Sequence, residues 1–257
     1  MLFVALYLNF QHSVLTFVMV YARPAIVFYM LPVLGERVLS NLIIKNTIIS
    51  LTIIGLWPCA ETVMEPAQGW FIILVKECIV GLILAMTLCV PFWCVIGLGE
   101  ILDNQRGSTI SESIDPVNGV QSSIFSGFLN FAFGAIFFSS GGMQRLMEMM
   151  SQSYQVLPRG NSLNAIHWEQ AGHLVQLLMQ NSILLAAPVM FVMMVTEMLL
   201  GVFARYCPQL NPFSLSLMIK SVIAFLIFLL YGFQALTEKT VQMFLLSSFH
   251  QFIGRGI

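Results

Sequence analysis

The chain alternates long apolar runs with short polar interruptions. Six apolar segments are bounded by charged residues, prolines or glycines: Val14–Leu34, Ile43–Trp57, Trp70–Leu98, Ile124–Phe138, Gln170–Thr196 and Ser221–Thr237. A helix needs about 20 mainly apolar residues to span a bilayer, and no useful stretch shows the two-residue alternation of a strand. The pattern predicts an all-α, membrane-type protein of about six apolar helical segments, while Val241–Ile253 is amphipathic at best.

Prolines and glycines predict where these helices bend or end. Proline lacks a backbone N–H and clashes with the preceding turn, so we expect a kink or break at Arg23-Pro24, an end at Pro58 and a kink at Pro188. Gly141-Gly142 is a helix stop signal. The sequence Cys207–Pro212, with a proline near its start and another at its end, predicts a rigid hairpin corner.

Composition supports the membrane class. Hydrophobic residues make up 58% of the chain and charged residues 9%, with a mean hydropathy of +0.87, whereas a soluble domain carries about 25% charged residues. No linker separates two compositions, so we expect a single domain over residues 1–257. The first ten residues are apolar with no basic leader, which favours a retained helix over a cleaved signal peptide.

Five charged residues interrupt or border the apolar runs: Arg23, Lys76, Glu77, Glu197 and Lys220. A charge at the centre of a bilayer costs at least about 2.5–3.5 kcal/mol on insertion scales, so such residues pair or face water. Either an ion path or pairing between helices or subunits accounts for them. We favour pairing, because the charges do not recur at one depth. Lys76 and Glu77 point about 100° apart on a helix and cannot both face one partner.

The sequence offers no candidate catalytic residues, cofactor site or metal ligands. The motifs of metalloproteases, serine hydrolases and phosphate-binding loops do not occur. The five cysteines form no CxxC pair, and His167 and His173 are six residues apart, which does not suit ligands on one helical face. An aspartyl protease would need two carboxylates on facing helices, but Asp103 and Asp115 share one stretch. A net charge of −1 without basic patches gives no sign of nucleic-acid binding.

One polar stretch, from about residue 100 to 123, stands between two strongly apolar runs. It contains the turn signals Arg106-Gly107 and Pro116–Gly119. An ordinary solvated loop is one interpretation, but structureless loops of this length are uncommon unless they are functional.

The residues of this stretch carry a resemblance. The run DNQRGSTISESIDPVNG, Asp103–Gly119, resembles the signature of the SctT/SpaR/YscT/FliR family, the T subunit of type III secretion export apparatus. KECIVGLILA, Lys76–Ala85, is similar to the family's Glu-xxx-Gly segment, SGGM at Ser140–Met143 to its glycine stop, and Ala186–Ser221 to its C-terminal block. NQRG and PQLNPFS look closer to the virulence-associated members than to the flagellar ones.

The resemblance implies a role and partners. Such a subunit assembles with R and S subunits into an export gate at the bacterial inner (cell) membrane, within the basal body of the secretion system. A U switch subunit docks on it, and secreted unfolded proteins pass through the pore. The stretch Asp103–Val120 corresponds to a loop that plugs the closed pore, and its polar and glycine positions are Asp103, Asn104, Gln105, Arg106, Gly107, Ser108, Glu112, Asp115, Pro116 and Gly119.

The sequence therefore favours a structural and gating subunit that is not an enzyme and binds no cofactor. We expect Gly107 and Gly119 to be flexible positions, and Asp103, Arg106, Glu112 and Asp115 to form weak pairs that break at low cost. The alternative is a stand-alone small-solute transporter, which should show internal repeats or paired broken helices. No repeat of fixed period is present.

Overall fold

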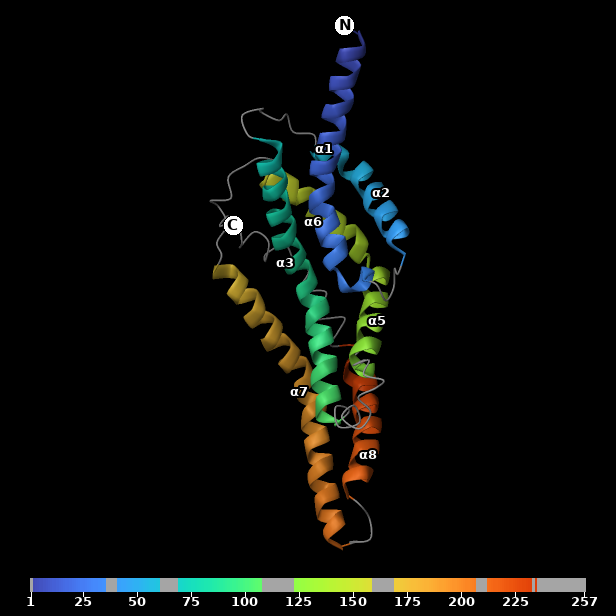
Figure 1. Ribbon diagram of the computed structural model, residues 1–257. Helices are drawn as coiled ribbons and strands as arrows, with labels where there is room; N and C mark the ends of the chain where they lie inside the picture. The colour runs from blue at the N-terminus through green and yellow to red at the C-terminus, as the bar shows by residue number, and fades with distance from the viewer. Residues whose placement is uncertain are drawn as a thin grey trace, which may run out of the picture. The chain divides into compact units, whose positions relative to one another are not determined.

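The computed structural model describes residues 2–35, 41–60, 69–107, 123–158, 169–206, 212–232 and 234. Most of these residues are helical and none lies in a strand, which confirms the all-α prediction for the described part of the chain. The helices are α1 (Leu2–Met30), the 3-10 turn η1 (Pro32–Leu34), α2 (Leu42–Ala60), α3 (Trp70–Gln105), α5 (Ile124–Ser139), α6 (Gly142–Val156), α7 (Glu169–Tyr206), α8 (Pro212–Ile227) and the π-helical segment η4 (Phe228–Gly232) (Figure 1).

Each of the six predicted apolar segments lies largely within described helices. The end of the last segment, at residues 233 and 235–237, lies outside the described residues. Three of the helices are long and apolar enough to cross a membrane, over Ser13–Met30, Trp70–Gln105 and Val175–Tyr206. The shorter apolar helices cover Leu42–Trp57, Phe125–Ser139 and Met218–Gly232. The predicted segment Val241–Ile253 lies outside the described residues.

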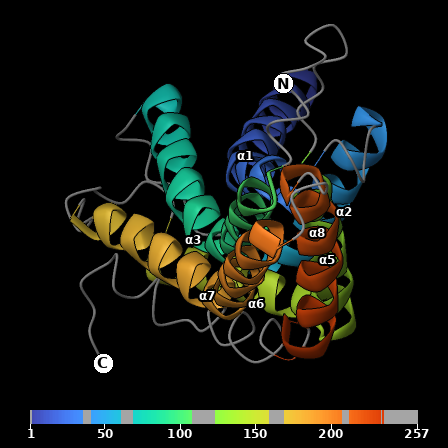
Figure 2. The ribbon, with the colours of Figure 1, turned by 90° about the horizontal axis from the view of Figure 1, so that it is seen from below.

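The helices form two compact units, and α3 contributes to both. In the first unit α1 packs against α2 and α2 packs against α6, with α3 taking part as far as Val90. Figure 2 shows α1 and α2 as neighbours. The second unit contains α3 from Pro91 onward with most of α5 and α7, and α8 with η4. Its core includes Phe92, whose ring meets those of Phe133 and Phe137 on α5 at centroid distances of 4.9 and 5.3 Å.

Two helix ends differ from the sequence predictions. α2 continues past Pro58 to Ala60, so the proline does not end the helix; a proline ring fits the helical backbone and disturbs only the bond and carbonyl one turn earlier. α1 likewise continues through Arg23 and Pro24, so of the predicted kink or break, the break does not occur. The glycine stop is confirmed: α5 ends at Ser139, and Gly141, with a φ of +75°, separates it from α6.

Helix α6 was not predicted, since it lies between the fourth and fifth of the six apolar segments. The helix is amphipathic: Leu146, Met150, Ser153 and Tyr154 are buried and recur every three or four residues. The predicted corner at Cys207–Pro212 lies outside the described residues, except that Pro212 begins α8, where a missing N–H costs least.

Candidate functional site

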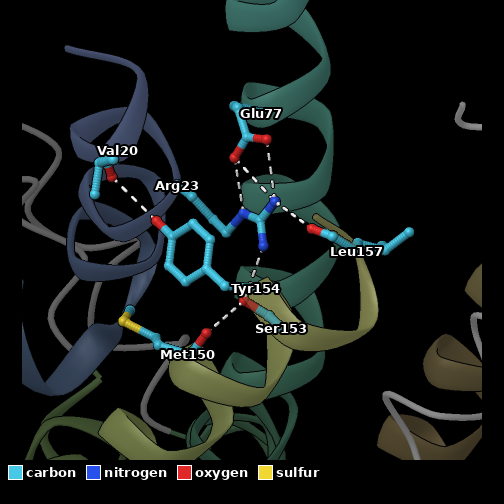
Figure 3. A network of polar contacts seen from close by, with 7 residues as sticks. All are labelled: Val20, Arg23, Glu77, Met150, Ser153, Tyr154 and Leu157. Atoms are coloured by element: carbon cyan, nitrogen blue, oxygen red, sulfur yellow. Dashed lines mark hydrogen bonds and ion pairs between the residues drawn. The ribbon is translucent and has the colours of Figure 1, made fainter. Parts of the chain in front are cut away.

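A fully buried arginine is the centre of a polar network in the first unit (Figure 3). Arg23 on α1 is only 1% exposed. Its Nε donates to Oε2 of Glu77 on α3 at 3.0 Å, and its Nη2 donates to Oε1 at 3.1 Å. Two parallel bonds between a guanidinium and a carboxylate are the strongest arrangement open to such a pair. The charge that interrupts the first apolar segment is therefore neutralised by the charge that interrupts the third.

Helix α6 supplies the remaining partners of Arg23. Nη1 donates to Oγ of Ser153 at 3.1 Å, and Nη2 donates to the carbonyl oxygen of Leu157, also at 3.1 Å. Leu157 directly follows the last turn of α6, where the helix dipole favours a cation. The guanidinium also lies over the ring of Tyr154, 4.2 Å from its centroid. Three helices thus meet at one charge, and every nitrogen of the guanidinium has a partner.

Pro24 shapes the same network from the backbone. A proline at this position has no N–H to offer the carbonyl of Val20, four residues earlier in α1. The hydroxyl of Tyr154 donates to that carbonyl oxygen at 3.1 Å (Figure 3). The acceptor that proline leaves without a helical donor is therefore satisfied by α6, which explains why the helix tolerates Pro24 in its interior.

Gly81 lets α3 approach α1 at this point. A Cβ atom on Gly81 would lie 3.1 Å from the Cα of Arg23 and 3.2 Å from its carbonyl oxygen. Glu77 and Gly81 are four residues apart and share one face of α3. The carboxylate of Glu77 binds the arginine side chain, and Gly81, which has no side chain, lets the arginine backbone come close to α3. This gives a physical reason for the Glu-xxx-Gly spacing.

Two of the other charges in apolar runs form a second pair, and the third, Lys76, is the neighbour of Glu77 in the chain. Lys220 on α8 pairs with Glu197 on α7, with Nζ and Oε2 2.9 Å apart. Lys76 is half-buried, whereas its neighbour Glu77 is buried, as expected for side chains that point in different directions. These pairs agree with pairing between helices rather than an ion path.

A second anchor on α3 lies in the second unit, where Asp103 caps the start of α5. Asp103 is 2% exposed. Its Oδ2 accepts hydrogen bonds from the backbone N–H groups of Phe125, at 3.0 Å, and Ser126, at 3.4 Å, and from the hydroxyl of Ser123. A carboxylate at a helix N-terminus satisfies donors that the helix leaves free and interacts favourably with its dipole.

Arg106 and the glycine after it complete this end of α3. The guanidinium of Arg106 forms an ion pair with Asp103, with Nη2 2.5 Å from Oδ1. Gly107 has a φ of +82°, the left-handed conformation that commonly ends a helix and favours glycine. The expected pairing of Asp103 with Arg106 is present, and Asp103 is also buried and bound to three groups at the start of α5. The other two residues of the expected set, Glu112 and Asp115, lie outside the described residues.

The boundaries of the polar stretch also change. Glu100 to Gln105, predicted as loop, form the last turns of α3, because Leu102 and Asp103 are buried there and continue its packing face. Asn104 is exposed and Gln105 is partly exposed. Five of the predicted loop residues lie outside the described residues: Ser108, Glu112, Asp115, Pro116 and Gly119.

Two glycines before Asp103 let other helices of the second unit approach α3. A Cβ on Gly99 would lie 2.8 Å from the backbone nitrogen of Ser126 on α5 and closer still to its Cα, a separation that real Cβ atoms do not show. A Cβ on Gly97 would lie 3.1 Å from Oγ of Ser182 on α7, and that hydroxyl donates to the Cys94 carbonyl at 3.1 Å. Gly99 and Asp103 therefore hold the first turn of α5 against the last turns of α3.

Sequence reasoning missed the contribution of α6. Ser153, Tyr154 and the carbonyl of Leu157 were not candidates, although the spacing of Leu146 and Met150 would have placed Ser153 on a buried face. Among the residues that the structure describes, no group of three His, Cys, Asp or Glu side chains could hold a metal ion.

Known proteins resemble the chain over most of its length. The sequence profile of the family "Bacterial export proteins, family 1" matches residues 14–246. The surface presentation of antigens protein SpaR of Salmonella typhimurium is 35% identical over 94% of this chain and 92% of the relative. The Yop proteins translocation protein T of Yersinia pestis is 28% identical, over 91% and 92%. The flagellar biosynthetic protein FliR of Bacillus subtilis is 23% identical, over 82% and 83%.

The higher identity to secretion proteins than to the flagellar relative places the chain on the virulence-associated side, as the sequence motifs predicted. Together with the apolar helices, these relatives identify a multi-pass inner-membrane subunit of a type III secretion export gate, and they do not favour a small-solute transporter. The chain belongs to the family "Bacterial export proteins, family 1".

Proposed function

We propose that the chain assembles with the R and S subunits of the export apparatus, binds the U switch subunit, and lines a pore through which unfolded substrates pass. In this proposal the chain is a structural and gating subunit and catalyses no reaction. The single domain predicted over residues 1–257 would act as one export-apparatus component. Support comes from the family membership, and from exposed apolar side chains along α1, α2 and α7 that suit contact with other subunits or lipid.

The segment from Asp103 to Val120 is, in this proposal, the gate. The observation that carries it is the contact between Asp103 and the start of α5, because these two positions flank residues 108–122 in the sequence. A segment whose two ends are fixed by a buried carboxylate can close a pore and still move between its ends. Local opening of such segments costs only a few kcal/mol.

Deletion of Ser108–Ser113 tests the gate. The deletion leaves Asp103, Arg106 and the start of α5 unchanged, so we expect normal assembly together with increased permeability of the inner membrane to ions and small dyes. The measurements are co-purification of the R and S subunits, and dye uptake or conductance in cells that make the complex.

Glu148→Gln is a matched control, since Glu148 is an exposed carboxylate on α6 in the other unit and its replacement should change neither readout. If the deleted complex assembles and dye uptake stays at the level of this control, the segment is a solvated connector and does not seal the pore.

A further inference from the structure

Glu197 is a charged side chain on an exposed apolar helix face. It lies on α7 and is 57% exposed, whereas its partner Lys220 on α8 is only 7% exposed. Lys220 Nζ lies 2.9 Å from Oε2 of Glu197, and a carboxylate has a second oxygen with its own acceptor sites. The pair is therefore one-sided: its cation is enclosed, and its anion faces out of the second unit.

The side chains around Glu197 are apolar and more exposed than those of α3. Only 28% of the apolar stretch of α7 is buried, against 61% for that of α3. We call the exposed row beside Glu197 the Glu197 face: Met194, one turn before Glu197, is 42% exposed, and Met198 and Val202, which follow it at four-residue spacing, are 62% and 58% exposed. An apolar surface of this kind is covered by lipid or by protein.

The length of α7 shows that lipid alone cannot cover this face. The apolar stretch Val175–Tyr206 has 32 residues, which at 1.5 Å per residue is about 48 Å long, whereas the hydrocarbon core is about 30 Å thick. Helix tilts reach about 40°, and a helix of this length would need more than that to fit. Either Glu197 therefore lies in hydrocarbon, or the apolar residues after it lie outside the hydrocarbon.

Both placements are unfavourable without a protein neighbour, because one buries an exposed carboxylate in lipid and the other exposes Leu199, Val202 and Phe203 to water. We propose that the Glu197 face is covered by an apolar helix of another export-apparatus subunit, and that this helix presents a lysine or arginine to the outer oxygen of Glu197. Charge complementarity selects a basic side chain, since the accessible group is an anion. The identity of the subunit rests on the proposed function, whereas the existence of a protein neighbour does not.

Paired substitutions test the electrostatic part. Glu197→Leu should lower the recovery of the other export-apparatus subunits about tenfold, as loss of a buried interfacial charge partner does. Replacing both partners, Glu197→Leu with Lys220→Leu, removes the pair without leaving a charge, and buried pairs often tolerate this when they serve only each other. We expect the double variant to remain deficient. Full recovery in the double variant would show that Glu197 serves Lys220 alone and would overturn the proposal.

Crosslinking tests what covers the face. A photoreactive amino acid at Met198 or Val202, in the complete assembled complex, should yield a product with another protein subunit, whereas the same group at the buried Met193 should react within the chain. Products with lipid only, with the chain's own residues only, or with a second copy of the chain would overturn the proposal. So would labelling of a Met198→Cys variant by a water-soluble thiol reagent in the assembled complex. A product with a protein outside the secretion apparatus would still show that protein covers the Glu197 face, but it would contradict the proposed function.

Discussion

Helix α3 carries an acidic residue and a glycine four positions apart in each unit. In the first unit Glu77 binds the side chain of Arg23, and Gly81 allows the backbone of Arg23 to lie close to α3. In the second unit the order is reversed: Gly99 lets the backbone of Ser126 come close, and Asp103 caps the first turn of α5, which contains Ser126. The same spacing serves both contacts because residues four apart lie on one face of a helix.

The two contacts differ in what they hold. The bonds of Glu77 end on a cation that is enclosed by three helices, so breaking them leaves an uncompensated buried charge. Those of Asp103 end on backbone N–H groups at a helix start and on Arg106 one turn away, and water can replace such partners at lower cost. The comparison indicates that Glu77 and Gly81 stabilise the core of the first unit. In the second unit, Gly99 and Asp103 stabilise the start of α5, where the polar stretch ends.

Removing one charge of the first contact should have the largest effect. Arg23→Ala leaves Glu77 buried without a cation, and breaking a buried pair in this way costs about 3–5 kcal/mol. We expect a strongly lowered thermal unfolding midpoint and a low steady-state amount of the chain in the assembled complex. Arg23→Lys keeps the charge but not the paired geometry, so it should fall between the alanine variant and the original.

The control is Glu148→Ala, at an exposed position of α6, which should unfold at the original temperature. An Arg23→Ala variant as stable as this control would show that the network contributes nothing, and the contrast between the two contacts would disappear.

Replacing Gly99 or Gly81 by alanine should show which of the two helix contacts is more tightly packed. Gly99→Ala places a Cβ 2.8 Å from the backbone nitrogen of Ser126 and closer still to its Cα, whereas Gly81→Ala places one 3.1 Å from the Cα of Arg23. Overpacking costs about 1–3 kcal/mol, and we expect Gly99→Ala to be the more harmful in thermal unfolding of the complex.

Gly55 on α2 offers the control, because a Cβ added there would meet no heavy atom of another helix within 4 Å. Gly55→Ala should therefore be neutral or stabilise by about 0.5–1 kcal/mol. Equal midpoints for the Gly99 and Gly81 variants would contradict the close crossing of α3 and α5.

Neutralising the second anchor should loosen a boundary without unfolding the protein. Asp103→Asn keeps the shape of the side chain but weakens the cap of α5 and its pair with Arg106, at a cost of about 1–2 kcal/mol. We expect an assembled complex with raised dye uptake. Glu100→Gln, an exposed carboxylate on the same helix, is the matched control. Loss of assembly in the asparagine variant, with no leak from the assembled fraction, would make Asp103 a core residue like Glu77.

The smallest effect belongs to the hydroxyl that compensates for Pro24. Tyr154→Phe leaves the Val20 carbonyl without a donor and should cost about 1 kcal/mol. Pro24→Ala restores a backbone N–H to that carbonyl, so Tyr154→Phe should cost less in the alanine background. A double-mutant cycle of unfolding free energies measures this coupling, and additive effects would refute the link between the proline and the tyrosine.

The sequence predicted the helices better than their partners. Apolar runs mark six helices, because a helix surrounded by lipid or protein is apolar on most sides. α6 escaped because it is polar overall and shows its buried side only as the spacing of Leu146, Met150 and Ser153. The pairing of Arg23 with Glu77 could not be derived, since 54 positions separate them and only the folded chain brings the two residues together.

The polar stretch was recognised as distinctive, but its boundaries were placed by polarity alone. Glu100 and Asn104 are polar because they face outward, and Asp103 is polar because it caps another helix. Within one turn of α3, a polar residue can therefore be either exposed to solvent or buried as a cap. Only its position in the helical period distinguishes the two cases. The role of residues 108–122 as a gate stays a prediction.

The Arg23 network also constrains how the protein is made. Ribosomes add about 5–20 residues per second, so Glu77, 54 positions after Arg23, is synthesised about 3–11 s later. Ser153 and Leu157, 130 and 134 positions away, follow after about 7–27 s. During that interval α1 carries a cation without its final partners, which disfavours its stable insertion as an isolated helix. Helix α1 can therefore complete its contacts around Arg23 only after α6 has been synthesised.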